Sequence, residues 1–323
     1  MSTLLRPATA PTVIAVVGPT AVGKSSCAEG LARALGGEIV SADAMQVYRG
    51  MNIGTAKPAA DERTVPYHCI DLVNPGEAYS AARFQHDART AIADIAARQR
   101  RPILCGGTGL YVRAALDDWS FPSGEVATPA RARLEALAAE IGPERLHALL
   151  AERDSEAAAR IHPNNVRRVV RALEMGEAGT SYAEQAAGFA VRESIYDVVM
   201  IGLAMDRDRL YARVDGRVDA MLAAGLLDEV RALLSRGFRE ALTAAQAIGY
   251  RELVPVIEHA ADLSDAVASI KRATRRYAKR QMTWFRADPR IRWLDVTELS
   301  PERVRSAALR LVESRERPAP PGV

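Results

Sequence analysis

Cysteine is scarce in this sequence: Cys27, Cys69 and Cys105 are the three present among 323 residues. No two of them form a C-x-x-C pair, and three cysteines cannot supply the four ligands of a zinc ribbon. The sequence therefore excludes a cysteine zinc finger and a disulfide-rich scaffold, and we expect a cytoplasmic protein. Because Cys27 and Cys105 fall at apolar positions, we expect both to be buried thiols.

Long apolar runs and an excess of one charge are also missing. No stretch approaches the ~18 apolar residues of a membrane span, so we expect no membrane association. Ala8-Thr9-Ala10 resembles a signal cleavage site, but no apolar segment precedes it, and we expect a short disordered lead instead. With Lys+Arg 43 and Asp+Glu 40, the net charge of +3 indicates no partner by itself. Any basic surface must come from local clustering.

The most informative stretch that is present runs from residue 13 to residue 25. An apolar run, 13–17, predicts a buried strand, and helical spacing follows over 26–35 until two glycines. The turn between them matches G-x-x-x-x-G-K-[ST], whose backbone N–H groups bind phosphate. Its residues are Gly18, Pro19, Thr20, Ala21, Val22, Gly23, Lys24 and Ser25. Lys24 would supply charge to the terminal phosphates and Ser25 a hydroxyl to Mg²⁺; a glycine-rich turn that binds nothing is the alternative, which the flanking strand and helix disfavour.

The rest of the chain alternates apolar runs with amphipathic stretches. Strands are expected at 38–43, 70–72, 102–105, 197–205 and 291–296, and helices at 81–98, 207–224, 250–260 and 263–286. This alternation predicts an α/β fold, a P-loop NTPase-like parallel sheet with flanking helices.

Between the strand expected at 102–105 and the strand expected at 197–205, the composition changes to that of short helices rich in Ala, Arg and Glu. We expect an inserted small helical domain there. The predicted organisation is 1–119 for the first part of the core, 120–195 for the insertion, 196–310 for the return to the core, and 311–323 for a disordered tail rich in Pro and Arg.

Two predicted turns lie at the same edge of the sheet as the phosphate loop. Asp43 ends one strand, where a carboxylate can act as a general base or a metal ligand, or simply cap a turn. Gly106-Gly107-Thr108-Gly109 follows another strand, where many P-loop ATPases carry a magnesium-binding Asp. This sequence has Cys105 instead, which counts against an ATP-driven motor, although 106–109 is also compatible with a plain strand-to-helix turn.

The predicted helix 263–286 is basic along one side, with no acidic residue between Asp265 and Asp288. At ~100° per residue the cations fill one arc and apolar residues, among them Trp284, fill the other. The cations are Lys271, Arg272, Arg275, Arg276, Lys279, Arg280 and Arg286. Charge of one sign favours a nucleic acid partner over a solvated helix face, which usually mixes both signs.

Smaller basic groups are less decisive. The insertion carries Arg160, His162, Arg167, Arg168 and Arg171, which suit either RNA contacts or internal salt bridges. Arg213 and Arg217 lie one helical turn apart, so either could clamp a diphosphate, although an ordinary surface pair fits the spacing as well.

Beyond these residues, the sequence resembles the bacterial tRNA dimethylallyltransferases, also called tRNA isopentenyltransferases. The motifs include Gly-Pro-Thr-Ala-Val-Gly-Lys-Ser at 18–25, Gln-Ala-Ile-Gly-Tyr at 246–250 and Lys-Arg-Gln-Met-Thr-Trp-Phe-Arg at 279–286. The other matching segments are 41–58, 79–81, 106–111, 159–164 and 171–174. They occur in one order over residues 13 to about 295.

The resemblance implies transfer of a dimethylallyl group from dimethylallyl diphosphate to N6 of the adenosine 3′-adjacent to the tRNA anticodon, with release of diphosphate. It implies that the phosphate loop binds this donor and not primarily ATP, and that Lys24, Ser25, Mg²⁺ and Arg217 stabilise the leaving diphosphate. Asp43 would take the proton of the exocyclic amine and Thr108 would place the adenine. A base stacked in a duplex cannot reach such a pocket, so the adenosine must be flipped out.

The same resemblance implies a tRNA anticodon stem-loop as partner of a protein we expect to be monomeric. The implied tRNA-binding residues are Asp43, Ala44, Met45, Gln46, Arg167, Arg168, Val169, Val170, Arg171, Ala245, Gln246, Ala247, Ile248, Gly249, Tyr250, Arg275, Arg276, Lys279 and Arg280. The insertion corresponds to the part of the family that handles the anticodon region. The motifs taken one by one leave two other functions open, a small-molecule or nucleoside kinase and a non-catalytic RNA-binding NTP switch.

Overall fold

The computed structural model describes residues 11–121, 128–241 and 243–316. The chain forms two compact units, one of Met1–Asp118 with Ser194–Val323 and one of Trp119–Glu193. The expected insertion, 120–195, differs from the second unit by one residue at its start and two at its end. Each unit has its own fold and is described by itself.

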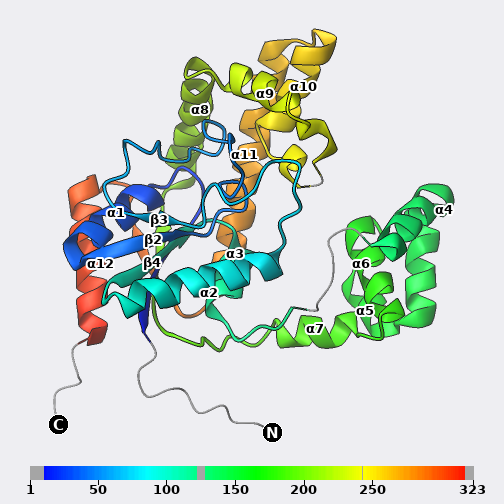
Figure 1. The fold of residues 1–323 in the computed structure, drawn as a ribbon, viewed down its shortest axis with the longest axis horizontal. Helices are drawn as coiled ribbons and strands as arrows, with labels where there is room; N and C mark the ends of the chain where they lie inside the picture. Colours follow the sequence, from blue (N-terminus) through cyan, green and yellow to red (C-terminus); the bar gives the residue numbers. More distant parts are fainter. Residues whose placement is uncertain (1–10, 122–127, 242, 317–323) are drawn as a thin grey trace, which may run out of the picture. The chain divides into compact units, whose positions relative to one another are not determined.

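A six-stranded parallel sheet forms the centre of the larger unit (Figure 1). The order is β3-β2-β4-β1-β5-β6. The strands are β1 (Thr12–Val17), β2 (Gly37–Ser41), β3 (Tyr67–His68), β4 (Arg101–Gly106), β5 (Asp197–Ala204) and β6 (Ile291–Asp295). β1, β2 and β4 are buried almost throughout, as expected for strands covered on both faces. The predicted α/β fold with a parallel sheet is confirmed.

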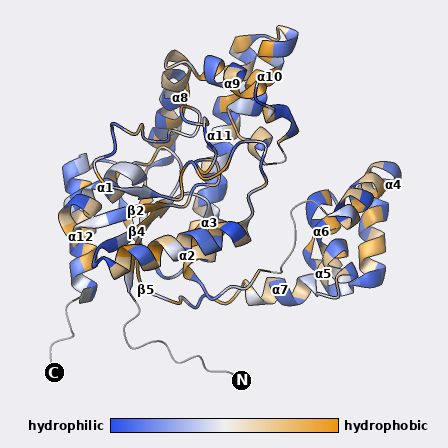
Figure 2. Ribbon diagram, in the orientation of Figure 1, coloured by the Kyte–Doolittle hydropathy of each residue, from blue (hydrophilic) through white to orange (hydrophobic). Residues whose placement is uncertain are grey.

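Helices cover both faces of this sheet because parallel strands need right-handed crossovers. α1 (Lys24–Leu35) and α12 (Pro301–Glu316) pack with one set of strand side chains, while α2 (Ala81–Ala97) packs on β2 and β4 outside that cluster. Ser80 caps the start of α2, because its side chain accepts the N–H of Arg83. Its mixed orange and blue ribbon in Figure 2 is typical of an amphipathic helix.

The remaining helices of the larger unit gather beyond the carboxyl ends of the strands or beside them. They are α3 (Gly109–Leu116), α8 (Arg207–Ala223), α9 (Leu226–Leu234), α10 (Tyr250–His259) and α11 (Leu263–Arg286), with short 3-10 turns at Phe238–Glu240 and Ala244–Gln246. α11 begins after Asp262, whose carboxylate caps it, and its bounds are those predicted from the sequence. Within the described ranges, no helix combines the length and the apolar content needed to cross a membrane.

The smaller unit is entirely helical where it is described. Its helices are α4 (Pro129–Arg153), α5 (Ser155–Arg160), α6 (Val166–Glu177) and α7 (Tyr182–Gly188). α4 is broken at Gly142, where φ is 80°, so the expected short helices appear there as one long element with a kink. Leu146, Leu150, Val169 and Leu173 belong to its core.

Two sequence expectations about the larger unit are wrong. The short strand expected at 70–72 lies instead at Tyr67–His68, because Cys69 and Asp71 adopt positive φ values of 60° and 53° that a strand cannot accommodate. The tail expected to be disordered from 311 is helical through Glu316, because α12 buries Val304 and Val312 in the cluster it shares with α1. Residues 317–323 lie outside the described residues.

The chain leaves and re-enters the larger unit at one point. Asp117 and Ser194 form an antiparallel bridge, and the Ile195 N–H donates to the Leu116 carbonyl at 2.9 Å. Asp117 is fully buried, and Arg113 and Arg290 both pair with its carboxylate. The two ends of the insertion are therefore held together on the larger unit.

Candidate active site

The phosphate loop leaves β1 at the carboxyl edge of the sheet with the backbone that its glycines allow. Gly18 has φ 144°, and a Cβ there would lie 2.6 Å from the Leu203 carbonyl oxygen, so no larger residue fits. Gly23 has φ 105° and precedes the first turn of α1, which directs the positive end of that helix toward the loop. Lys24 Nζ donates to the Pro19 carbonyl at 2.7 Å and thereby closes the loop.

A cavity of about 330 Å³ lies over this loop. It is lined by Ala21, Gly23, Lys24, Ser25, Ser26, Ala56, Arg213 and Arg217. Three cations therefore surround a space bounded by backbone N–H groups, which is the chemistry of a diphosphate site. The pKa of Lys24 is lowered to about 8, mainly by burial and in part by the positive charge of Arg217, while Asp43 opposes the shift.

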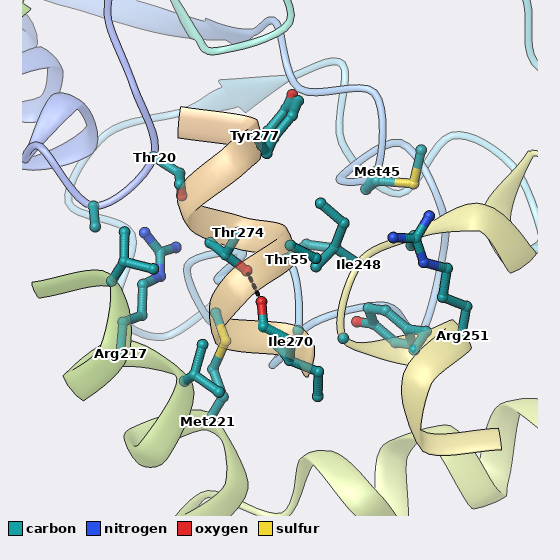
Figure 3. A pocket seen from close by; sticks show the side chains of 18 of the residues that line it. Thr20, Met45, Thr55, Arg217, Met221, Ile248, Arg251, Ile270, Thr274 and Tyr277 are labelled. Atoms are coloured by element: carbon teal, nitrogen blue, oxygen red, sulfur yellow. Dashed lines mark hydrogen bonds between the residues drawn. The ribbon is translucent and has the colours of Figure 1, made fainter. Parts of the chain in front are cut away.

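A second cavity, of about 680 Å³, opens beside the first and shares Ala21 and Arg217 with it. In Figure 3, α11 crosses the centre of the view as one wall of this cavity, with Thr20 and Arg217 on one side of the helix and Ile248 and Arg251 on the other. Asp43 and Thr108 line the same space. The structure thus brings the three residues expected to be catalytic, Asp43, Thr108 and Arg217, to one cavity that adjoins the phosphate loop.

Asp43 and Thr108 are held by a small network between two turns. Asp43 Oδ1 accepts the Met45 N–H at 2.9 Å, and Thr108 Oγ1 accepts the Ala44 N–H at 3.0 Å. The Thr108 N–H in turn donates to the Ala42 carbonyl at 3.2 Å. Among the described residues Asp43 Oδ2 has no hydrogen-bond partner, so one carboxylate oxygen remains available to accept a proton from a ligand.

Gln281 of α11 ties the phosphate loop to the turn that carries Thr108. Its Oε1 accepts the Thr20 N–H at 2.8 Å, and its Nε2 donates to the Gly107 carbonyl at 2.9 Å. The side chain is buried, and a Cβ on Gly107 would lie 2.2 Å from Gln281 Nε2. The sequence had indicated only that position 281 faces the protein, because the two turns that it joins are far away in the chain.

The cations of α11 differ in what they contact. Arg276 and Arg280 line the larger cavity, and Arg280 lies 5.6 Å from the ring centre of Tyr277. Lys271 and Arg275 instead form salt bridges of 2.6 Å with Asp219 and 3.2 Å with Asp215 on α8. The expected side of undiluted positive charge is therefore wrong at these two positions, because another helix supplies the acids that α11 lacks.

Other expected residues have mixed outcomes. Trp284, expected to pack inside, is 43% exposed, although a Cβ on Gly109 would lie 2.1 Å from its ring. Val169 and Val170 belong to the core of the helical unit, so their side chains are buried. Arg167 and Arg168 are exposed. Arg171 bonds Glu174 at 2.8 Å, which is the salt bridging that the sequence left open.

Most of the segment 245–250 lines the larger cavity. Gln246, Ala247, Ile248, Gly249 and Tyr250 line it, and so do Ala44 and Met45, whereas Ala245, Gln46, Arg275 and Lys279 are not among its lining residues. The sequence missed an apolar wall made of Val214, Val218, Met221, Leu226 and Ile270. Their helical spacing signals burial, but it cannot show that the buried face borders a cavity.

The cysteines next to the site do not take part in its charge. All three are free and buried, which confirms the expectation for Cys27 and Cys105. Burial raises the pKa of Cys105, at the end of β4, to about 12. The thiol that stands in the place of an ATPase aspartate is therefore neutral at physiological pH. Among the described residues no group of three or more His, Cys, Asp or Glu side chains forms a metal site.

Comparison with protein families finds two matches. The IPP transferase model matches residues 46–288, and the isopentenyl transferase model matches residues 11–65. A tRNA dimethylallyltransferase of Symbiobacterium thermophilum is 52% identical over 288 residues, which is 88% of this chain and 89% of the relative. A tRNA dimethylallyltransferase of Geobacillus thermodenitrificans is 48% identical over 288 residues, with 88% and 91% covered.

Solved structures agree with these matches. A full-length tRNA isopentenylpyrophosphate transferase from Bacillus halodurans superposes with a TM-score of 0.70 at 42% identity, covering 94% of this chain and 97% of its own. A eukaryotic dimethylallyltransferase, captured in crystallographic snapshots acting on tRNA, superposes with a TM-score of 0.78 at 29% identity, covering 95% and 80%.

Proposed function

This chain belongs to the IPP transferase family of tRNA dimethylallyltransferases, and from this premise we propose that it transfers a dimethylallyl group from dimethylallyl diphosphate to N6 of the adenosine 3′-adjacent to the tRNA anticodon. One observation supports the proposal most directly. The phosphate-loop cavity and the cavity that contains Asp43 and Thr108 share Ala21 and Arg217. A donor with its diphosphate in the first cavity extends its allylic carbon into the second.

The smaller cavity fits the leaving group of such a donor. Lys24, Arg213 and Arg217 offer three positive charges to a diphosphate, and the loop offers backbone N–H groups. Charge that develops on the leaving oxygen meets donors already in place, which is the main way that such sites lower a barrier.

The residues present also fit a magnesium ion that binds together with the donor. Mg²⁺ keeps several waters and takes one or two protein ligands plus phosphate oxygens, so it does not require a carboxylate cluster. The exposed hydroxyl of Ser25 lines the cavity and would hold it. When bound, the ion would neutralise part of the charge on the leaving diphosphate.

The larger cavity fits the acceptor. Its volume of about 680 Å³ suits a nucleoside-sized ligand, and Tyr250 and Tyr277 supply aromatic surface. In the proposed reaction the N6–C1 bond forms, the C1–O bond to diphosphate breaks, and the proton of the exocyclic amine passes to Asp43 Oδ2. Thr108, whose Oγ1 fixes the backbone beside Asp43, places the adenine. Arg276 and Arg280 bring positive charge to the same cavity for the RNA backbone.

A reconstituted reaction tests this function. The protein is incubated with dimethylallyl diphosphate, Mg²⁺ and unmodified tRNA, and the nucleosides are then analysed by mass. We expect one adenosine next to the anticodon to gain a single C5H8 unit, with release of diphosphate. If the tRNA stays unmodified and the protein transfers phosphate from labelled ATP to a small acceptor, the protein is instead a small-molecule or nucleoside kinase.

A further inference from the structure

One carboxylate outside the proposed catalytic set has an unusual number of partners. Glu229, on α9, accepts the backbone N–H groups of Asn52 at 3.0 Å, Ile53 at 2.8 Å and Gly54 at 3.2 Å. It also accepts the hydroxyl of Tyr250 at 2.6 Å. Four hydrogen bonds use most of the capacity of an ionised carboxylate, whereas an amide could accept at one oxygen alone.

The segment that Glu229 holds borders both cavities. We name residues 52–57 the strap. Thr55 of the strap lines the larger cavity, and Ala56 lines the smaller one. Tyr250, the fourth partner of Glu229, lines the larger cavity as well. A single side chain therefore bonds a segment that borders both cavities and a tyrosine that lines the larger one.

The contact between the strap and Tyr250 is close. A Cβ on Gly54 would lie 2.4 Å from the Tyr250 ring, so only glycine fits at this position. Ala56 has φ 46°, a conformation that a non-glycine residue keeps only when its surroundings hold it. Any loosening of the strap would therefore move residues in both cavities.

The other end of the strap is anchored by its own part of the chain. Gln46 Nε2 donates to the Thr55 carbonyl at 3.2 Å. Lys57 is buried and donates to the Tyr48 carbonyl at 2.7 Å and to Asp71 at 2.6 Å. Glu229 joins the beginning of the strap to α9 and α10.

We propose that Glu229 is a positioning residue for prenyl transfer: by bonding the strap and Tyr250 together, it fixes a segment that borders both cavities and so aligns donor and acceptor. The proposal rests on the proposed function and adds to it a residue that contacts neither substrate. It requires that Glu229 protect the amides of residues 52–54 from hydrogen exchange. It also requires that kcat, the rate of the bound complex, depend on these hydrogen bonds.

Hydrogen exchange of the strap amides gives the first test, and it does not depend on any activity. Wild type is compared with Glu229→Gln, which keeps the size of the side chain and removes acceptor capacity. Asp228→Asn is the matched control, since Asp228 lies next in the same helix and pairs with the exposed Arg231. We expect exchange at residues 52–54 to become about 10- to 100-fold faster in Glu229→Gln and to stay unchanged in Asp228→Asn. Unchanged exchange in both variants would overturn the proposal.

Steady-state kinetics gives the second test. We expect Glu229→Gln to lower kcat by about tenfold or more, because misplacement of reacting groups by a fraction of an ångström is costly, with a smaller change in the KM for tRNA. Tyr250→Phe removes one of the four bonds, should fold even if Glu229→Gln does not, and should show a smaller loss in the same parameter. Faster exchange with kcat unchanged would show a merely structural role and refute the proposal. An inactive wild type would instead refute the proposed function while leaving the exchange result intact.

Discussion

Lys24 makes donor binding depend on pH in a direction that the structure fixes. Burial holds the pKa of this ammonium near 8 in the free protein, well below its usual 10.5. A bound diphosphate favours the charged form, so the pKa rises again in the complex. Above pH 8 the free protein has lost a proton that the complex retains, and binding must take that proton up. Donor affinity is therefore expected to fall as pH rises through 8.

The size of the change in donor affinity follows from the fraction of Lys24 that is protonated in the free protein. With a pKa of about 8, the apparent Kd at pH 9 is about tenfold weaker than at pH 7, and uptake approaches about one proton at pH 9 against about a tenth at pH 7. A phosphate monoester completes its ionisation near pH 6, so the donor keeps its charge over this range. The thiol of Cys105, with a pKa of about 12, stays neutral.

Isothermal titration with dimethylallyl diphosphate at pH 7 and pH 9, in two buffers of different ionisation enthalpy, measures both quantities. Lys24→Arg is the control, because a guanidinium stays charged throughout; its donor Kd should be weaker at pH 7 but flat with pH. A wild-type Kd that is constant from pH 7 to pH 9, or a titration without proton uptake, would refute the assignment of Lys24 to the diphosphate.

Three further experiments test the other parts of the site. Asp43→Asn should keep its affinity for tRNA and lose about 10²- to 10⁴-fold in prenyl transfer, as for a lost general base; full activity in a single-turnover assay would remove Asp43 from the mechanism. Arg276→Glu with Arg280→Glu should weaken tRNA binding and reduce the slope of log Kobs against log[salt] by about one unit per lost phosphate contact. Arg275→Ala, which loses an internal salt bridge, should change this slope less. Equal slopes for the two variants in filter binding would contradict this ranking. Gln281→Met should lower the free energy of unfolding by about 1–3 kcal/mol and raise the KM for the donor, and a denaturant titration that matches wild type would show that the bonds to the two loops contribute little.

The parts of the fold that the sequence predicted are those encoded locally. The apolar run 13–17, the glycines that follow it and the helix 263–286 each depend on residues near one another in the chain, and the structure has them where they were expected. A resemblance over most of the chain then supplied the family, which no single motif could do. α12 was missed although Val304, Ala308 and Val312 repeat at helical spacing, because the Pro- and Arg-rich end dominated the composition.

The parts that escaped prediction depend on which distant segments meet. The helix 263–286 contains no acid after Asp265, yet Asp215 and Asp219 neutralise two of its cations from α8. Glu229 looks like any surface carboxylate of an amphipathic helix, and only the fold brings it to the amides of residues 52–54. Tertiary packing decides such pairs, so a periodicity argument can place a residue on a face but cannot say what that face meets.

The antiparallel bridge between Asp117 and Ser194 has a consequence for how this enzyme can vary. The segment that leaves the larger unit and the segment that returns to it pair side by side. Both ends of the 75-residue insertion, Trp119 to Glu193, are therefore attached to the larger unit at one place. Replacing this insertion by one of different length would not change how the strands of the sheet pair with one another. The insertion can therefore change in length or sequence while the glycine loop and the sheet around it stay as they are.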